Sequence, residues 1–281
     1  MEPMTPVSTG GAGGDRAADY LRDGYLVARG LFTPAEAGAI TRHFMAMHAA
    51  GGVPGKYEPK PDGFSDGFHY DFTHGDPLAA FPRVMWPHGF MPEIRRFVLD
   101  QRLFTVMADL LGEEVLNSSS MFYFKPPRAR GQAFHQDNFY IRVRPGTCLG
   151  AWIACDPCDA GNGALQVVPG SHRLPIYCPE VADPANYFAR ELVQPPAGMA
   201  PVMPILQPGD VIFFHGNLIH GSEPNTSTDR FRRSLVLHYI PESTVEVARY
   251  DDPLLDRHGR EFRRAEAAGG GPCGTPYSIV H

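Results

Sequence analysis

The sequence predicts a mainly β fold, a sandwich or open barrel of short strands with flanking α-helices. Helical patterns are confined to the first 112 residues, whereas short apolar runs bounded by Gly, Pro, Asn or Asp follow one another from residue 115 onward. The chain also holds 30 glycines and 28 prolines, which indicates many turns and long loops instead of a helical bundle. We therefore expect helices first and a β core after them.

One domain is expected at residues 15–281, after a disordered tail at 1–14. Its helical part covers 15–112 and its β core about 115–241. An extension at 242–281 completes it.

Caps and periodicity predict the helical part. Residues 15–30 hold a short helix that leads into a strand. A second helix begins at Thr33, whose capping box is closed by Glu36. Its buried face consists of apolar residues at helical spacing, namely Ala37, Ile40, Phe44 and Met47. A pair of helices is expected within 92–111, ended by Gly112.

Residues 51–92 show little periodicity and are dense in Pro, Gly, His and aromatic residues. A segment of this length without regular structure is usually functional or disordered. For its His-rich part, residues 69–88, we predict a lid that excludes water and shapes the substrate pocket. A second metal site is the alternative for its histidines, but no ligand spacing repeats on one element.

Six strands are expected in the β core, each bounded by turn-forming residues. They cover residues 121–124, 134–143, 149–155, 165–168, 211–214 and 232–240.

Charge and hydropathy exclude several functions. The formal net charge of −6 argues against nucleic acid or an anionic membrane as a partner. No apolar run in the sequence approaches the length of a membrane span, and the N-terminal residues lack a signal-peptide pattern. We expect a cytoplasmic enzyme. Its oligomeric state is not predicted.

The five cysteines are expected to be reduced structural thiols, because their number is odd and no secretion signal is present. Cys155 and Cys158 have CxxC spacing, so a zinc ribbon or a thiol redox pair is an alternative. No second CxxC accompanies them.

His135 and Asp137 form the first half of a candidate metal site. Side chains alternate along a strand, so these two residues would share one face while Gln136 points away. His220, at the end of the strand at 211–214, can add a third ligand. Two histidines and a carboxylate leave positions open on an iron ion, whereas a structural metal site is closed. Taken alone the His-x-Asp spacing is weak, because the chain has 12 histidines.

Arg232 and Ser234 strengthen this interpretation. They share a face of the last strand by the same alternation. A guanidinium with a neighbouring hydroxyl suits a remote carboxylate. The sequence therefore predicts an anchor for an acidic cosubstrate next to the metal.

The ordered set of motifs resembles the phytanoyl-CoA dioxygenase family of iron(II)- and 2-oxoglutarate-dependent oxygenases. The resemblance runs from about residue 19 to about residue 241. It consists of His135-Gln136-Asp137, Asn162-Gly163-Ala164-Leu165, Pro169-Gly170-Ser171-His172, His220-Gly221-Ser222, Asn225 and Arg232-Arg233. It implies a double-stranded β-helix, the cupin-like jelly roll, and the cofactors Fe(II), 2-oxoglutarate and O₂.

Site roles follow from the resemblance by position. His135, Asp137 and His220 resemble the iron ligands. Arg232 resembles the residue that binds the far carboxylate of 2-oxoglutarate, assisted by Ser222, and Trp152 resembles a residue of that pocket. The distance from the distal histidine to the arginine is one residue longer than usual in the family, so Arg233 is an alternative to Arg232.

The implied reaction hydroxylates an unactivated C–H bond of a small-molecule metabolite and decarboxylates 2-oxoglutarate to succinate. Relatives that halogenate have Ala or Gly where this chain has Asp137, so hydroxylation is favoured. Desaturation, epoxidation or cyclisation are alternatives. Two other classes are considered. A non-redox cupin-type metal protein has no need of the dicarboxylate anchor at Arg232 and Ser234, and a silent binding module would be expected to have lost a metal ligand.

Further residues are predicted near the site. Tyr123 and Lys125 precede the metal motif and are candidates for the cosubstrate pocket. Candidates for substrate contact are Asn138, Phe139, Tyr140 and His215. Packing in the core or an exposed loop is the alternative for each of them.

Overall fold

The computed structural model describes residues 16–51, 78, 83–248, 253–267 and 272–274. The tail predicted at 1–14 and most of the lid predicted within 51–92 lie outside the described residues. The described end of that segment includes a strand, so it is more regular than the sequence predicts.

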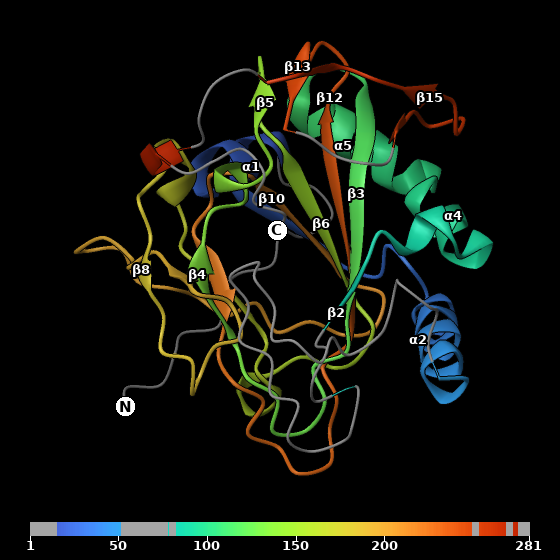
Figure 1. Ribbon diagram of the computed structural model, residues 1–281, viewed down its shortest axis with the longest axis vertical. Coiled ribbons are helices and arrows are strands. Elements are labelled where there is room, and N and C mark those ends of the chain that lie inside the picture. The colour runs from blue at the N-terminus through green and yellow to red at the C-terminus, as the bar shows by residue number, and fades with distance from the viewer. Residues whose placement is uncertain (1–15, 52–77, 79–82, 249–252, 268–271, 275–281) are drawn as a thin grey trace.

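Two β-sheets face each other (Figure 1). The large sheet has the order β1-β10-β6-β12-β3-β14-β15, with β2 paired to β3, and the small sheet has the order β4-β11-β7. The strands of the large sheet are β1 (Tyr25–Ala28), β2 (Arg83–Met85), β3 (Val115–Tyr123), β6 (Leu149–Ala154), β10 (Val211–His215), β12 (Ser234–Pro241), β14 (Leu254–Leu255) and β15 (Glu261–Phe262). Those of the small sheet are β4 (Gln132–His135), β7 (Leu165–Val167) and β11 (His220–Ser222).

Shorter elements border these sheets. The strands β5 (Val143–Arg144), β13 (Glu246–Val247) and β16 (Ala265–Glu266) pair with one another, as do β8 (Glu180–Val181) and β9 (Glu191–Leu192). The 3₁₀ helices are η1 (Pro87–Gly89), η2 (Asp137–Phe139), η3 (Ala160–Asn162), η4 (Ser171–Arg173) and η5 (Pro272–Gly274).

The helices form where the sequence predicts them. They are α1 (Arg16–Asp23), α2 (Pro34–Ala49), α4 (Pro92–Val98) and α5 (Gln101–Leu111). The capping box of α2 is present: the Thr33 hydroxyl accepts from the Glu36 backbone N–H at 3.2 Å, and the Glu36 carboxylate accepts from the Thr33 N–H at 2.7 Å. Gly112 ends α5 at a φ of +75°, which glycine adopts without steric cost.

The large sheet separates two layers of core because successive side chains on a strand point to opposite faces. On one face, Phe213, Leu235 and Leu237 pack with buried residues of the helices. Figure 1 shows α2 and α4 on this side, away from β4. On the other face, Phe214 and Val236 pack against residues of the small sheet. The space between the sheets is where the predicted site residues meet.

Three strand predictions need correction. The chain leaves the strand after His135, and Asp137 begins a 3₁₀ turn whose carbonyl accepts from the backbone N–H groups of Tyr140 and Ile141. The strand predicted at 134–143 is therefore wrong. His220 does not end β10 but lies in β11, in the opposite sheet. Arg232 lies just before β12.

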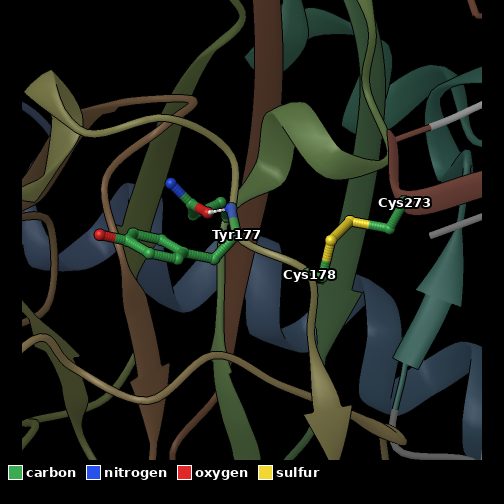
Figure 2. Close-up of a disulfide and its surroundings, with 4 residues drawn as sticks. Tyr177, Cys178 and Cys273 are labelled. Carbon is green, nitrogen blue, oxygen red and sulfur yellow. Dashed lines mark hydrogen bonds between the residues drawn. A yellow bond between two sulfur atoms is a disulfide. The ribbon is translucent and has the colours of Figure 1, made fainter.

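The prediction of reduced cysteines holds for three of the five. Cys148, Cys155 and Cys158 are buried and reduced, as expected. Cys178 and Cys273 instead form a disulfide, which ties the segment before β8 to η5 (Figure 2). A pairing between residues this far apart in the sequence cannot be deduced from cysteine spacing.

Among the described residues, no helix is long and apolar enough to cross a membrane.

Candidate active site

A pocket lies between the two sheets and holds the predicted metal ligands. The large sheet supplies Met121, Tyr123, Trp152, Phe214, Val236 and His238, and the small sheet supplies Gln132, His135, Leu165, His220, Gly221 and Ser222. Asp137 and Arg232 complete the lining. The empty space of the pocket, together with its open mouth, is about 400 Å³.

His135, Asp137 and His220 converge in this pocket. His135 and His220 are direct partners in the pairing of β4 with β11, so the small sheet fixes both rings. Asp137 Oδ1 lies 3.6 Å from the Nε2 atom of each histidine. All three side chains are buried, with 1–5% exposure. The predicted His-x-Asp pair thus meets its distant partner, although a turn and not strand alternation places the aspartate.

The outer ring nitrogens show how the imidazoles are oriented. His135 Nδ1 lies 2.8 Å from the Ala133 carbonyl oxygen, and His220 Nδ1 lies 2.9 Å from that of Leu218. A carbonyl only accepts, so Nδ1 of each ring carries the hydrogen and donates. Nε2 of each ring faces Asp137 Oδ1 and is the nitrogen left to bind a metal.

Burial and neighbouring side chains together set the charges of the site. Burial, and then the neighbouring His220, lower the pKa of His135 to about 3, so this imidazole is neutral at physiological pH. Burial alone would raise the pKa of Asp137, but His220 and His238 lower it below its ordinary value. The site thus holds one carboxylate and a neutral imidazole at His135, which is the protonation state that a divalent metal requires.

This donor set fits a metal ion such as iron(II). Donor atoms of the three residues lie within 4.8 Å of one another. Two imidazole nitrogens and a carboxylate oxygen come together here, an arrangement that a cation stabilises. Two nitrogens and one oxygen also match the facial triad of non-haem iron oxygenases, which leaves coordination positions open.

Arg232 lies deeper in the same pocket, 4% exposed. Its Nε donates to the Gly163 carbonyl at 3.1 Å, and its Nη1 donates to the Ser234 hydroxyl at 3.2 Å. Its guanidinium carbon lies 5.2 Å from the ring centre of Trp152. Burial lowers the pKa of Arg232, yet guanidinium remains charged in proteins. The predicted face shared with Ser234 is observed.

Lys125 adds a buried amine beside Arg232. Its Nζ donates to the Ser222 hydroxyl at 2.9 Å and to the Glu223 carbonyl. Burial, and then the charge of Arg232, lower the pKa of Lys125 well below its ordinary value. Gly163 is required here, since its φ is +68° and a Cβ at this position would lie 2.4 Å from the Glu223 carbonyl oxygen. Lys125, Ser222 and Arg232 therefore form one polar cluster.

The adjacent Arg233 points elsewhere. Its side chain makes a two-pronged ion pair with Asp156, at 2.7 and 2.8 Å. Its backbone N–H also donates to that carboxylate. Of the two arginines that the sequence left as alternatives, Arg232 is the one in the pocket.

The predicted substrate residues separate into two groups. Asn138 is used by hydrogen bonds with Thr147, Cys148 and Asn217, and Phe139 packs in a core cluster. His215 accepts from the Asn217 N–H at 3.0 Å. These three lie outside the pocket lining, which does not support the predicted substrate contact.

Tyr140 lies nearer to the metal ligands. Its ring centre is 6.3 Å from that of His135, and its hydroxyl bonds to Glu191. It is the member of the predicted substrate group whose position fits that role best.

Sequence reasoning missed Gln132, Arg83 and His238. The Gln132 amide nitrogen lies 3.2 Å from His135 Nε2. Arg83 is 2% exposed and its Nη1 lies 3.4 Å from the Tyr123 hydroxyl, but it belongs to a segment without periodicity. His238 follows Ser234 at even spacing on β12, so strand alternation could have found it.

Comparison with known proteins agrees with this geometry. The family model described as Phytanoyl-CoA dioxygenase (PhyH) matches residues 20–234, which is most of the chain. The chain belongs to the phytanoyl-CoA dioxygenase family. Its members include 2-oxoglutarate-dependent dioxygenases, so membership and the His-Asp-His site together make this protein an iron- and 2-oxoglutarate-dependent dioxygenase.

Curated relatives of the family are moderately similar. A "Probable alpha-ketoglutarate-dependent hypophosphite dioxygenase" of Stutzerimonas stutzeri is 26% identical over 233 residues, which cover 80% of this chain and 77% of the relative. The "Phytanoyl-CoA dioxygenase, peroxisomal" of Bos taurus is 26% identical over 230 residues, 78% of this chain. The alignment covers only 66% of the bovine protein.

Solved structures show the same fold. The epimerase SnoN, crystallised with Fe³⁺, alpha-ketoglutarate and nogalamycin RO, superposes with a TM-score of 0.65 at 22% identity. The match covers 91% of this chain and 94% of SnoN. The expected jelly roll is thereby confirmed.

Proposed function

We propose that this protein hydroxylates a C–H bond of a small-molecule metabolite, with iron(II) held by His135, Asp137 and His220 and with 2-oxoglutarate held by Arg232. The observation that carries the proposal is the position of a buried, charged guanidinium in the same pocket as the three converging ligand atoms. A non-redox metal protein needs no carboxylate anchor, and a silent binding module has no need of an intact ligand set.

Each residue has a defined task in this mechanism. Arg232 and Ser234 bind the far carboxylate of 2-oxoglutarate by a charge-assisted bond and a hydroxyl contact. Ser222 and Lys125 add polar groups at the same end, and Trp152 forms an apolar wall. Iron(II), once bound with 2-oxoglutarate and O₂, supplies the oxidising chemistry. Burial of these side chains excludes water from the reacting atoms.

Other oxidative outcomes are compatible with the same residues. Desaturation, epoxidation and cyclisation need the same three ligands and the same anchor. Epimerisation joins them because SnoN, a structural neighbour of this chain, is an epimerase. Halogenation is disfavoured because Asp137 occupies the position that a halide would take. Hydroxylation remains the simplest product of this site.

The partner of the site is a small molecule. The net charge and the pocket between the sheets favour this over nucleic acid or a membrane surface. The cytoplasmic location expected from the sequence is part of the proposal.

Succinate formation tests the proposal. The purified protein, supplied with Fe(II), O₂ and 2-oxoglutarate, is expected to form succinate, and His135→Ala is expected to abolish it. His258→Ala is the matched control, because His258 is exposed and lies outside the pocket. A wild-type protein that forms no succinate, or whose succinate formation is unchanged by His135→Ala, would contradict the proposal. Incubation with a metabolite pool, scored for gain of one oxygen atom, then identifies the substrate.

A further inference from the structure

The two carboxylate oxygens of Asp137 have different surroundings. Oδ1 faces the Nε2 atoms of His135 and His220 at 3.6 Å. Oδ2 points to the large sheet and lies 3.0 Å from His238 Nε2. A carboxylate only accepts hydrogen bonds, so this imidazole nitrogen carries the hydrogen and donates it. One oxygen is thus engaged by the protein while the other faces the metal position.

The other ring nitrogen of His238 also has a hydrogen-bond partner. This Nδ1 atom lies 3.0 Å from the Ser119 hydroxyl on β3. A serine hydroxyl can donate to this nitrogen or accept from it, so the contact holds the ring in place. Ser119, His238 and Asp137 are thus linked by hydrogen bonds from the large sheet to the metal site. Exposure of the three is 1–3%, so water does not compete for these bonds.

The backbone around His238 is also fixed by polar groups. The register between β12 and β3 shifts next to His238, a local irregularity that interrupts regular pairing. The His238 carbonyl accepts from the Ser118 hydroxyl at 3.2 Å and from the Asn117 amide at 3.0 Å. These bonds hold the strand where its ladder is irregular.

A polar run in the core thereby gains an explanation. Asn117, Ser118, Ser119 and Ser120 are consecutive and buried in a central strand, with 0–3% exposure. Polar groups in such a position destabilise a fold unless they are hydrogen-bonded. Three of the four bond to His238, and the fourth, Ser120, bonds to His88. These hydrogen bonds offset the cost of burying the run, and most of them converge on His238.

We propose that His238, oriented by Ser119, is a positioning residue that turns a single oxygen of Asp137 toward the metal. The inference rests on the proposed function, since it assumes that Asp137 binds iron. Engaging Oδ2 keeps the carboxylate from chelating with both oxygens, so the remaining positions stay available for the cosubstrate and O₂. Partners of metal ligands that lie one shell outward are known to control affinity in this way.

Metal affinity tests this role without any measurement of turnover. We would titrate the purified metal-free protein with Co(II), and with Fe(II) under anaerobic conditions, and record the dissociation constant. Loss of the donor in His238→Ala is expected to weaken binding by about 10- to 100-fold. Gln presents its amide nitrogen at about the position of Nε2, so His238→Gln is expected to recover most of the affinity.

A matched pair of serines separates orientation of the ring from support of the strand. Ser119→Ala removes the hydroxyl that contacts the His238 ring, and it is expected to weaken metal binding by several-fold. Ser118→Ala removes an equally buried hydroxyl whose hydrogen bond, among the described residues, goes to the His238 carbonyl and not to its ring, and it is expected to leave affinity unchanged. The absorption of the Fe(II)–2-oxoglutarate complex should shift in Ser119→Ala and not in Ser118→Ala.

The outcomes distinguish this inference from the proposed function. If the wild-type protein binds neither metal, the proposed function fails. If it binds metal and both His238→Ala and Ser119→Ala bind equally well, only the positioning role is overturned. Equal losses in Ser118→Ala and Ser119→Ala would also overturn it, because they would indicate general weakening of β3. Should His238→Ala fail to fold, His238→Gln and the serine pair still decide the question.

Discussion

Arg232 and Arg233 are adjacent in the sequence but have different surroundings. Arg232 is buried among Gly163, Ser234 and Trp152, where no carboxylate among the described residues ion-pairs with it. Arg233 is neutralised by Asp156 on the edge of the fold. A buried guanidinium bonded to neutral groups attracts an anionic ligand, whereas a guanidinium already paired with a carboxylate attracts a further anion only weakly.

This difference predicts the effects of two matched substitutions. Arg232→Gln removes a charge-assisted contact and should raise the KM for 2-oxoglutarate by about 10- to 150-fold, equivalent to 1.5–3 kcal/mol. Arg233→Gln should leave this KM within about twofold while losing only a partly exposed ion pair. Succinate formation over a range of 2-oxoglutarate concentrations measures both. A larger rise in KM for Arg233→Gln would reverse the assignment.

At this scale the sequence predicts which residues meet in the pocket better than it predicts how the backbone brings them there. His135, Asp137 and His220 converge as the sequence predicts, although Asp137 reaches the pocket through a turn. Arg232 and Ser234 lie together as strand alternation predicts, and the same alternation leads on to His238. Arg83 could not have been predicted, because its place depends on the pairing of β2 with β3, which no local pattern encodes.

At the scale of elements, α2 stabilises the large sheet from the face opposite the pocket. Phe44 stacks on Phe122, with ring centres 3.8 Å apart and planes at 6°, and meets the edge of Phe124. All three rings are fully buried. Because Phe122 belongs to β3, which also carries Tyr123 into the pocket, the helix supports the wall of the site.

Truncating this contact should destabilise the protein. Phe44→Ala is expected to lower the free energy of unfolding by about 3–5 kcal/mol. Arg42→Ala, an exposed substitution on the same helix, should change it by less than about 0.5 kcal/mol. Urea unfolding monitored by circular dichroism measures both. The KM of the folded Phe44→Ala protein for 2-oxoglutarate should stay unchanged, and a raised KM would show that α2 reaches the pocket.

Elements with strong local signals were predicted with nearly correct bounds. The capping box at Thr33 and the glycine at 112 set the ends of α2 and α5, because side-chain and backbone bonds within a few residues decide them. The predicted bounds are wrong where contacts with residues distant in the sequence determine the end of an element. Asp137 leaves the strand because its turn is held partly by a bond from the Asn138 N–H to the Gly216 carbonyl, 78 residues away by their numbers.

At the scale of the whole molecule, long-range contacts hold the segment that carries His135 and Asp137. Gln136, buried between the two ligands in sequence, accepts from the Tyr177 N–H at 2.8 Å and donates to the carbonyls of Pro175 and Asn217. Cys178, which follows Tyr177, is joined by a disulfide to Cys273 (Figure 2). The disulfide and the Tyr177–Gln136 hydrogen bond thereby link η5 to the segment that carries the metal ligands. The disulfide is also the feature that fits least well with a reducing cytoplasm.

The response of the whole fold to acid should depend on a histidine outside the site. His215 lies at the end of β10, partly buried, with the ring of His172 5.5 Å away. Burial, and then His172, lower its pKa to about 4. The unfolded chain binds a proton at its ordinary pKa of about 6.5, so between these values the unfolded state binds more protons than the folded state. Stability is therefore fully present above about pH 6.5 and falls as the pH drops toward 4.

His215→Asn should make the protein less sensitive to acid. The asparagine oxygen can still accept from the Asn217 N–H, so the native hydrogen bond is kept. Between about pH 7 and pH 4.5, the wild-type protein should lose about 2–3 kcal/mol more unfolding free energy than the variant. Urea unfolding at the two pH values measures this, with chelator present because protons also compete with metal at the triad. His258→Asn, which replaces an exposed histidine, should behave as wild type. If His215→Asn loses as much stability as the wild-type protein, the acid response arises elsewhere, and the remaining partly buried histidine of this pair, His172, becomes the next position to substitute.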